Sequence, residues 1–356
     1  MIGFFAPVLV YAVITVLHLA VPARHVDGYV IDPSTQRPYR YRLNGLVVYA
    51  LTIGLWALAC SRGWLAWDFF WTTRWEGLAG ACALGLVFTL AIVLPAPPTG
   101  KGLAADLFLG RIENPQWLGG PIDAKMWLYL VGATMLGLNL YSFAMHQRLA
   151  FPEDPSPGVL LYAALFSFFL CEYLFFERVH LYTYDFFAER VGFKLGWGCL
   201  VFYPYFYVVG LWAVGDLPNP HPSVAMLVVA AICFFGGWSL ARGANMQKFA
   251  FKRDPSAPFL GMIPEVVTDG ERRLLVSGFW GLSRHINYLG EIGMATGLTL
   301  ALGYPSHWAT WLYPLYYVGL LVPRQRDDDA RCAAKYGALW TQYEKRVRWR
   351  IVPGIY

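Results

Sequence analysis

The stretch Ser277–Gly303, SGFWGLSRHINYLGEIGMATGLTLALG, passes from a polar, aromatic segment into an apolar run without a break. Four polar residues recur in it at the spacing i, i+3, i+4, i+7: Arg284, Asn287, Tyr288 and Glu291. In a helix this spacing would place all four on one face. A polar face beside hydrocarbon is costly unless polar groups meet it. The stretch therefore predicts a membrane span whose polar end meets a polar partner.

The composition supports a membrane protein. The chain has 356 residues, of which 57% are hydrophobic and 14% are charged, whereas a soluble domain carries about 25% charged residues. A span needs roughly 20 apolar residues. Nine apolar runs approach that length: 3–21, 44–60, 77–95, 126–145, 158–176, 195–215, 223–241, 286–303 and 305–322. We therefore predict an all-α polytopic membrane protein with nine to ten transmembrane helices.

Two segments near the start of the chain bear on the number of spans. The apolar and aromatic segment 64–73 is a possible tenth span, but Asp68 and its shortness favour an interfacial position. The first run follows Met1 without a basic leader or a cleavage pattern, which predicts a retained span and not a signal peptide.

The distribution of basic residues predicts the orientation. With nine spans and the N-terminus outside, the inside loops hold 25 of the 28 Lys and Arg residues. Under the positive-inside rule this favours a cytosolic C-terminus. A tenth span would reverse the earlier loops and leave the segments 242–285 and 323–356 cytosolic. We expect a single membrane domain, with N-terminal spans in 1–157 and cofactor-binding and substrate-binding spans in 158–356.

Several classes of site have no sequence signal. The six cysteines include no CxxC pair, and the seven histidines show no HExxH spacing, so neither a disulfide scaffold nor a metal site is predicted. The chain also lacks GxGxxG and P-loop patterns. We expect no nucleic acid and no obligate protein partner; the expected partners are membrane lipids and a lipid substrate.

Two basic segments suit a small molecule that carries phosphate. In ARGANMQKFAFKRDPSAPF, residues 241–259, Lys248 and Lys252 would share a helix face. In the segment from Arg324 to the end, Arg324, Asp328 and Tyr336 recur at multiples of four, before a turn at Gly337. Arg and Lys bind phosphate, and Asp can bind a ribose hydroxyl or an adenine amine.

A simpler interpretation of these segments also stands. Basic segments beside spans commonly fix topology and bind anionic lipid headgroups. In the same way, Asn287 and Tyr288 would serve as an interfacial anchor.

Longer motifs resemble the sterol reductase family over nearly the whole chain. The most specific are LLVSGFWGLSRHINYLGE and RQRDDDARCAAKYGALWTQYEKRVRWRIVPGIY near the C-terminus. Further matches are NMQKFAFKRDP, FERVHLYTYDFFAERVGFKLGWG, VDGYVIDPSTQRPYRYRLNGL and GRIENPQW. The resemblance implies an integral membrane enzyme that transfers hydride from NADPH to a sterol carbon–carbon double bond.

The resemblance also implies roles for residues of the C-terminal half. The NADPH phosphates and adenosine would be held by Lys248, Lys252, Arg324, Asp328 and Tyr336. The nicotinamide side would be framed by Trp280, His285, Asn287 and Tyr288. The polar face at the end of the 286–303 run would then line a cofactor pocket open to the cytosol, where polar groups need not face lipid.

Three departures from the family pattern concern the choice of double bond. The family's Trp-Gly-Asp is Trp197-Gly198-Cys199 here, so an acid is lost. Met126 and Trp127 stand where an acidic-Arg-Pro run is expected after DAK, and the family's Trp-Trp pair is Phe279-Trp280.

Reduction of an unconjugated alkene also needs a proton donor in a dry site. The candidates are Glu172, Glu177, Asp185 and Tyr207. A carboxylic acid in apolar surroundings keeps its proton at neutral pH, and the last three lie at family-like positions. The alternative for each is a juxtamembrane charge or a tyrosine bonded to the backbone.

Two other functions remain open from the sequence. The pattern RHxxYxGE and a terminal YxxYxxxV also occur in isoprenylcysteine carboxyl methyltransferases, which use S-adenosylmethionine. A sterol-binding membrane protein without catalysis is the third possibility. The membrane would be the cytoplasmic membrane in a bacterium and the endoplasmic reticulum in a eukaryote.

Overall fold

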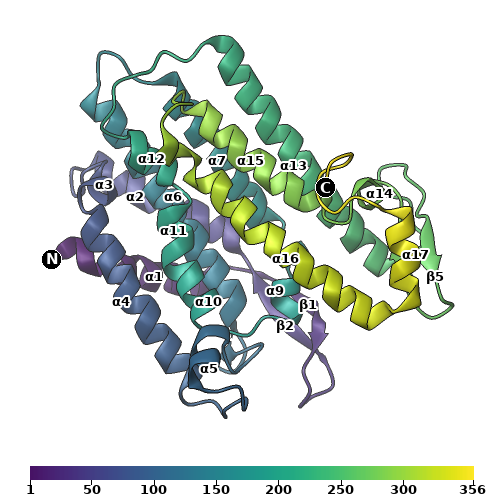
Figure 1. The fold of residues 1–356 in the computed structure, drawn as a ribbon. Helices are drawn as coiled ribbons and strands as arrows, with labels where there is room; N and C mark the ends of the chain where they lie inside the picture. Colours follow the sequence, from purple (N-terminus) through teal and green to yellow (C-terminus); the bar gives the residue numbers. More distant parts are fainter. The chain divides into compact units, whose positions relative to one another are not determined.

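The computed structural model describes residues 1–356 and is mostly helical (Figure 1). Six helical segments are long and apolar enough to cross a membrane: Ile2–Ala20 (α1), Arg74–Val93 (α4), Ala124–Ala150 (α6), Pro157–Phe175 (α7), Phe193–Val214 (α10 to α12) and Val224–Arg253 (α13). The other three predicted runs fall on α2 (Gly45–Ser61), α15 (Ile286–Ala301) and α16 (Leu312–Tyr336). The helical membrane fold is confirmed, while a total of nine or ten spans stays a prediction.

The chain packs as two compact units, residues 1–219 and 220–356, which are described separately. Besides its long helices, the first unit contains β1 (Arg24–Ile31), β2 (Pro38–Leu43), α3 (Phe69–Thr72), α5 (Leu103–Leu109), β3 (Gln116–Trp117), β4 (Ile122–Asp123), α8 (Glu177–His180), α9 (Tyr184–Phe187), α10 (Phe193–Trp197), the π-helical turn η1 (Gly198–Phe202), α11 (Tyr203–Phe206) and α12 (Val209–Val214).

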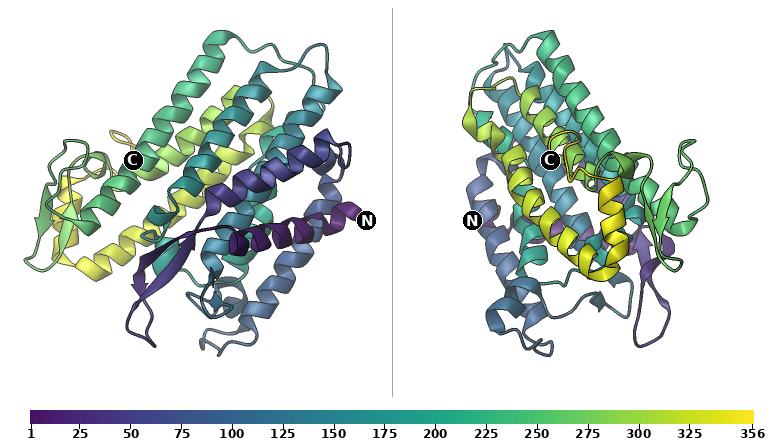
Figure 2. Two further views of the ribbon diagram at one scale, coloured as in Figure 1. Left: turned by 180° about the vertical axis from the view of Figure 1, so that it is seen from behind. Right: turned by 45° about the vertical axis from the view of Figure 1, so that its right-hand side comes forward.

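Short hairpins interrupt the predicted all-α pattern. The antiparallel pair β1–β2 connects α1 to α2 (Figure 2), and β3–β4 precedes α6. Val26 and Tyr41 of the first hairpin are buried against Met126 and Phe186. The hairpin therefore has a core-facing side, which explains why this charged loop is ordered into strands.

The segment 64–73 contains only the four-residue helix α3. Asp68, directly before it, pairs with His146 at 3.1 Å. Crossing the hydrocarbon takes about 20 helical residues, so α3 is too short to be a span.

Helix α6 is the most buried span of the first unit. Asp123 caps its start, where the carboxylate accepts hydrogen bonds from Lys125 N at 3.0 Å and Met126 N at 2.9 Å. Such a cap satisfies backbone donors that have no partner within the helix. Burial raises the pKa of Asp123 to about 6, while the two backbone donors and Lys125 oppose that rise.

The run 195–215 is a helical segment that contains the π-helical turn η1. Pro204 has no N–H group and cannot donate to the carbonyl of Leu200 one turn earlier. The hydroxyl of Tyr11 donates to this carbonyl instead, at 2.7 Å, and Asn139 donates to the carbonyl of Pro204 at 2.9 Å. In a membrane every backbone group needs an internal partner, and side chains of neighbouring helices provide it here.

The second unit is built on the long helices α13, α15 and α16. Its other elements are β5 (Val266–Thr268), β6 (Arg273–Leu275), α14 (Phe279–Leu282), η2 (Trp308–Trp311) and α17 (Ala338–Arg346). Helix α13 continues to Arg253, well beyond the predicted end at 241, so Lys248 and Lys252 lie one turn apart on it as predicted. Gly337, with φ of 54°, ends α16 at the predicted turn.

Helices α13 and α15 lie side by side in close contact (Figure 1), because glycines remove side chains from their interface. A Cβ added at Gly237 would lie 2.6 Å from Gly290 O, and one added at Gly297 would lie 2.6 Å from Phe234 N. Small residues of this kind let membrane helices approach closely.

The opening stretch differs from its prediction at one residue. Helix α15 begins at Ile286, so Arg284 lies before it and does not share the helical face of Asn287, Tyr288 and Glu291. Arg284 and His285 form a turn here, in which Arg284 N donates to Trp349 O at 2.9 Å and His285 N donates to Arg350 O at 2.8 Å. Pairing with a distant segment thus replaces the first helical turn.

Candidate functional site

The polar end of α15 is met by acids from α16 and α17. Arg284, only 6% exposed, lies 3.5 Å from Asp329 and donates to Glu344 at 2.5 Å. His285 and Arg350 each lie 3.6 Å from Asp329, and Gln325 donates to it at 2.5 Å. We call this group the Asp329 cluster: Arg284, His285, Gln325, Asp329, Glu344 and Arg350.

Next to this cluster, two predicted cofactor residues are bonded directly. The Tyr288 hydroxyl donates to Asp328 at 3.0 Å, and the Tyr288 ring stacks on His285 with ring centroids 4.9 Å apart. Arg331 pairs with the second oxygen of Asp328 at 3.1 Å. The structure therefore brings Tyr288, His285 and Asp328 together from α15, its leading segment and α16.

Lys248 faces the same part of α16. Its ammonium lies 5.3 Å from the ring centroid of Trp280, whose indole N–H donates to Ala244 O at 2.7 Å. Burial raises the pKa of the Cys332 thiol, Asp328 raises it further, and Lys248 lowers it. These effects require Lys248, Asp328 and Cys332 to be neighbours.

The remaining predicted cations lie around this group. Lys248 is within electrostatic range of Arg324, and Lys252 is within range of Lys248 and Lys335. Like charges repel one another, and Asp328 offsets this repulsion at Lys248 only in part, since burial and Arg324 both lower the pKa of Lys248. The arrangement therefore favours a ligand that carries several negative charges.

Tyr336 lies beside two cations at the end of α16. The Arg272 guanidinium is 5.6 Å and the Lys335 ammonium 5.1 Å from its ring centroid, and Trp340 stacks on it at 6.4 Å. Arg272, on the β5–β6 hairpin, was missed by the sequence analysis because nothing local in that hairpin indicates its neighbour.

Asn287 presents a buried acceptor without a partner. Its Oδ1 atom makes no hydrogen bond, and neither does the buried Nε2 of His285. Buried polar atoms are nearly always bonded, since leaving one unpaired costs about 1–3 kcal/mol. A carboxamide donor from a ligand would satisfy Asn287, so the residues present fit NADPH: cations for its phosphates and an amide acceptor for its nicotinamide.

The four proposed proton donors lie in the first unit, against different helices. Glu177 accepts a hydrogen bond from Gly45 N at 3.1 Å and so caps α2, and burial raises its pKa to about 7. Glu172 is buried within α7. The Tyr207 carbonyl accepts from the Tyr162 hydroxyl at 3.3 Å.

Asp185 lies on α9 and faces α6. The Tyr129 hydroxyl donates to its carboxylate at 2.7 Å, and Lys125 donates to its backbone carbonyl at the same distance. The sequence analysis missed both partners. Their spacing of four residues at the polar start of a span was the available signal, but nothing local related them to Asp185.

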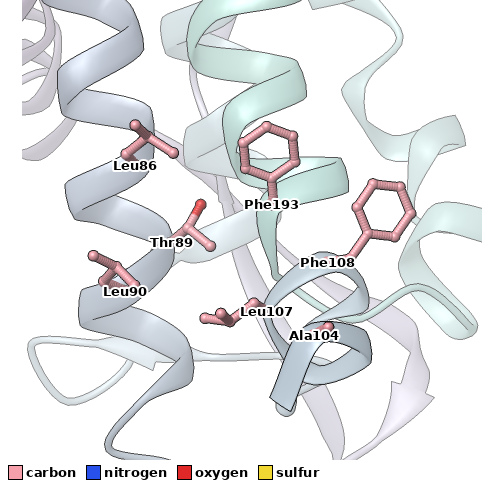
Figure 3. Close-up of a pocket in the computed structure, with 7 residues that line it drawn as sticks. All are labelled: Leu86, Thr89, Leu90, Ala104, Leu107, Phe108 and Phe193. Carbon is pink, nitrogen blue, oxygen red and sulfur yellow. The ribbon is translucent and has the colours of Figure 1, made fainter. Parts of the chain in front are cut away.

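Two further pockets lie in the first unit, away from these residues. One, of about 330 Å³, is lined by apolar side chains of α4, α5 and α10 and by Thr89 (Figure 3). The other, of about 650 Å³, lies between the two hairpins and includes His25, Arg40 and Arg42. Neither contains a predicted site residue.

The long apolar helices define an integral membrane protein. Its sequence then identifies the family: the chain belongs to the ergosterol biosynthesis ERG4/ERG24 family, whose model matches residues 3–356. The predicted resemblance to sterol reductases is thereby confirmed.

Similar proteins come from plants, animals and bacteria. The chain is 31% identical to the Delta(14)-sterol reductase of Arabidopsis thaliana, over 94% of this chain and 91% of the relative. It is 33% identical to the Delta(14)-sterol reductase TM7SF2 of Mus musculus, over 94% and 81%. It is 30% identical to the Delta(14)-sterol reductase of Methylotuvimicrobium alcaliphilum, over 89% and 75%.

Proposed function

We propose that this protein reduces the Δ14 double bond of a sterol, with NADPH as the source of hydride. The family and the names of its relatives support the substrate class and the bond. The observation that carries the cofactor is local: the bonded pair Tyr288–Asp328 lies beside Lys248, and the buried Oδ1 of Asn287 lacks a partner.

The proposed cofactor roles divide the site in two. Lys248, Lys252 and Arg324 bind the phosphates, and Asp328 and Tyr336 bind the adenosine. Trp280, His285, Asn287 and Tyr288 hold the nicotinamide side. When bound there, NADPH supplies hydride to the substrate.

For the proton we propose Asp185 as the donor. The O–H bond of its carboxylic acid breaks as a new C–H bond forms at one alkene carbon, and the cation left at the other carbon accepts the hydride. The Asp185 carboxylate is then reprotonated from water. Glu177 is better explained as the cap of α2, given its bond to Gly45; Tyr207 and Glu172 remain the other candidates.

Orientation follows from the basic segments. We propose that residues 242–285 and 323–356 are cytosolic, in the endoplasmic reticulum of a eukaryote or the cytoplasmic membrane of a bacterium. The test is labelling of a cysteine introduced near Arg273. Labelling from the outer side alone would contradict this orientation.

The function is tested with purified protein in detergent. Thermal stability is measured with NADPH, NADH and S-adenosylmethionine, and turnover is measured with a Δ14 sterol. Stabilisation by NADPH together with reduced sterol is the expected result. Stabilisation by S-adenosylmethionine alone would favour a methyltransferase, and NADPH binding without turnover of any sterol olefin would favour a binding protein.

A further inference from the structure

One helix holds Asp185 at both its backbone and its side chain. Lys125 and Tyr129 lie one turn apart near the start of α6. The Lys125 ammonium donates to the carbonyls of Asp185 at 2.7 Å and Phe186 at 3.1 Å. The Tyr129 hydroxyl donates to the Asp185 carboxylate at 2.7 Å. Two hydrogen bonds to Asp185 and a third to the next residue, Phe186, thus hold the acidic residue in position.

The Lys125 ammonium has an unusual environment. Its side chain is fully buried, it lies 5.8 Å from the ring centroid of Phe186, and Asp123 is a nearby acid. A buried ammonium is costly unless several acceptors surround it. Because two of those acceptors are carbonyls of α9, moving α9 would leave the charge unsatisfied. Lys125 therefore opposes displacement of the Asp185 backbone.

Titratable groups from four other elements lie around Asp185 and Tyr129. They are Lys125 and Tyr129 of α6, Tyr173 of α7, His180 of α8 and Cys199 of η1. Tyr129 lies at the centre of this set: its ring is 5.9 Å from that of Tyr173, 6.0 Å from that of His180 and 5.5 Å from that of Phe186. Packing on three sides holds its hydroxyl in one direction.

We infer that Tyr129 and Lys125 are positioning residues that hold Asp185 for proton donation. Lys125 fixes the backbone of α9, and Tyr129 fixes the carboxyl group and stabilises the carboxylate that remains after the proton leaves. The inference rests on the proposed function for the role of Asp185, whereas the contacts themselves do not.

The same arrangement explains how the site tolerates its missing acid. Cys199 stands where the family pattern has Asp, and a thiol in an apolar site is a poor acid for an alkene. Asp185 interacts electrostatically with Cys199, so the carboxyl group on α9, held from α6, is an acid that remains in the surroundings of this position.

The decisive variant is Tyr129→Phe, which removes one hydroxyl and keeps the packed ring. A hydrogen bond to a charged group is worth about 1.5–3 kcal/mol, or roughly ten- to hundredfold. We expect kcat to fall by at least about tenfold, with the KM for sterol and the Kd for NADPH unchanged. The alkaline limb of the kcat profile should move to higher pH, because the carboxylate has lost a stabilising donor.

Tyr141→Phe is the matched control on the same helix. It also removes a half-buried hydroxyl, which bonds to that of Tyr49 at 2.8 Å, far along α6 from Asp185. We expect it to keep the kcat and the pH profile of the wild-type protein. If Tyr129→Phe and Tyr141→Phe behave alike in kcat and pH profile, the assignment of Tyr129 is wrong.

A second measurement needs no substrate. Amide hydrogen exchange of residues 183–187 should be faster in Lys125→Met than in wild type, and Lys125→Arg should restore part of the protection. Equal exchange in wild type and Lys125→Met would overturn the role of Lys125. Wild-type protein without sterol turnover would contradict the proposed function, while this measurement would still decide whether α6 holds α9.

Discussion

The Asp329 cluster and the Asp185 site stabilise charged side chains inside the protein in different ways. In the Asp329 cluster, charged side chains pair with opposite charges, and Glu344 and Arg350 are about 40% exposed at their side chains. At the Asp185 site, the cation is fully buried and its acceptors are backbone carbonyls, while the carboxylate is bonded to a phenol. In the first site most charges pair with opposite charges and two of the side chains are partly exposed, whereas in the second a buried ammonium is bonded to carbonyls and a half-buried carboxylate to a phenol.

This difference shows what each site can do. Paired, accessible charges exchange partners readily and can accept a multiply charged ligand with little desolvation. The carboxyl group of Asp185 is half-buried and accepts a hydrogen bond from the Tyr129 phenol, so its protonation state depends on that donor. The Asp329 cluster lies beside the residues proposed to bind the nucleotide, and the Asp185 site suits the proposed proton transfer.

The largest effect is expected from a substitution between α13 and α15, the helices that carry the residues beside the Asp329 cluster. In Gly290→Val the new side chain would lie 2.5 Å from Gly237 O and would also meet Ala241 N, and neither backbone atom can move aside. Overpacking typically costs 1–3 kcal/mol, and about 3 kcal/mol or more is expected here. The yield of monodisperse protein and its melting temperature measure the loss.

The control is Gly236→Ala, since a Cβ at Gly236 meets no atom within 4 Å. It should fold as the wild-type protein does. A Gly290→Val protein with normal yield and melting temperature would show that α13 and α15 are not packed through their glycines.

Next in size is the effect of removing Asn287, the proposed acceptor for the nicotinamide amide. Asn287→Ala should fold and insert normally but lose about a hundredfold in turnover, since small misplacements of reacting groups have effects of this order. Arg324→Ala should lose NADPH affinity as well. Arg253→Ala, at the exposed end of α13, is the control and should retain both. Near-normal turnover in Asn287→Ala would leave Asn287 an interfacial anchor.

A smaller effect concerns the choice of nucleotide. If Lys248, Lys252 and Arg324 meet the 2′-phosphate, NADPH should bind about ten- to hundredfold tighter than NADH. Because salt screens exposed charges, this ratio should shrink as the ionic strength rises. The ratio of kcat between Tyr129→Phe and wild type should not change with salt. Equal affinities for NADPH and NADH at low salt would contradict the proposed contact of Lys248, Lys252 and Arg324 with the 2′-phosphate.

The smallest effect is a pH dependence of stability at Glu177. Its pKa in the folded protein is about 7, raised by burial from about 4.5, so the folded state holds the proton more tightly. Stability is therefore greatest below pH 4.5 for this group and decreases as pH rises toward 7. Glu177→Gln keeps the acceptor for Gly45 N and removes the titration.

The measurement is the melting temperature of both proteins between pH 5 and pH 8. The Gln variant should melt a few degrees higher than wild type at pH 8 and close to it at pH 5. A difference that is the same at both pH values would exclude titration of Glu177 as the cause.

Hydropathy predicted the helices well because a span needs a long apolar run, and that requirement is local. It did not predict the π-helical turn η1 within the run 195–215, because an average over the run does not register the missing N–H of Pro204. It also missed β1–β2, although the alternation around Val26 and Tyr41 was a usable sign of strands.

The site was predictable only where its residues follow a helical period. Lys248 and Lys252, and likewise Arg324, Asp328 and Tyr336, lie on helices as their spacing indicated. Arg284 does not lie on the predicted helix, because its conformation depends on backbone hydrogen bonds with residues 349–350. For the same reason the contact between Tyr129 and Asp185 was not predicted, because no local pattern relates residues on separate helices.

The pairing of residues 284–285 with residues 349–350 has a consequence for biosynthesis. Helices α13 and α15 are synthesised first, but the backbone N–H groups of Arg284 and His285, directly before α15, have no partner until Trp349 and Arg350 have left the ribosome. The Asp329 cluster, and the proposed nucleotide site beside it, are therefore completed late in synthesis. We expect an unfinished chain to lack the proposed cofactor site.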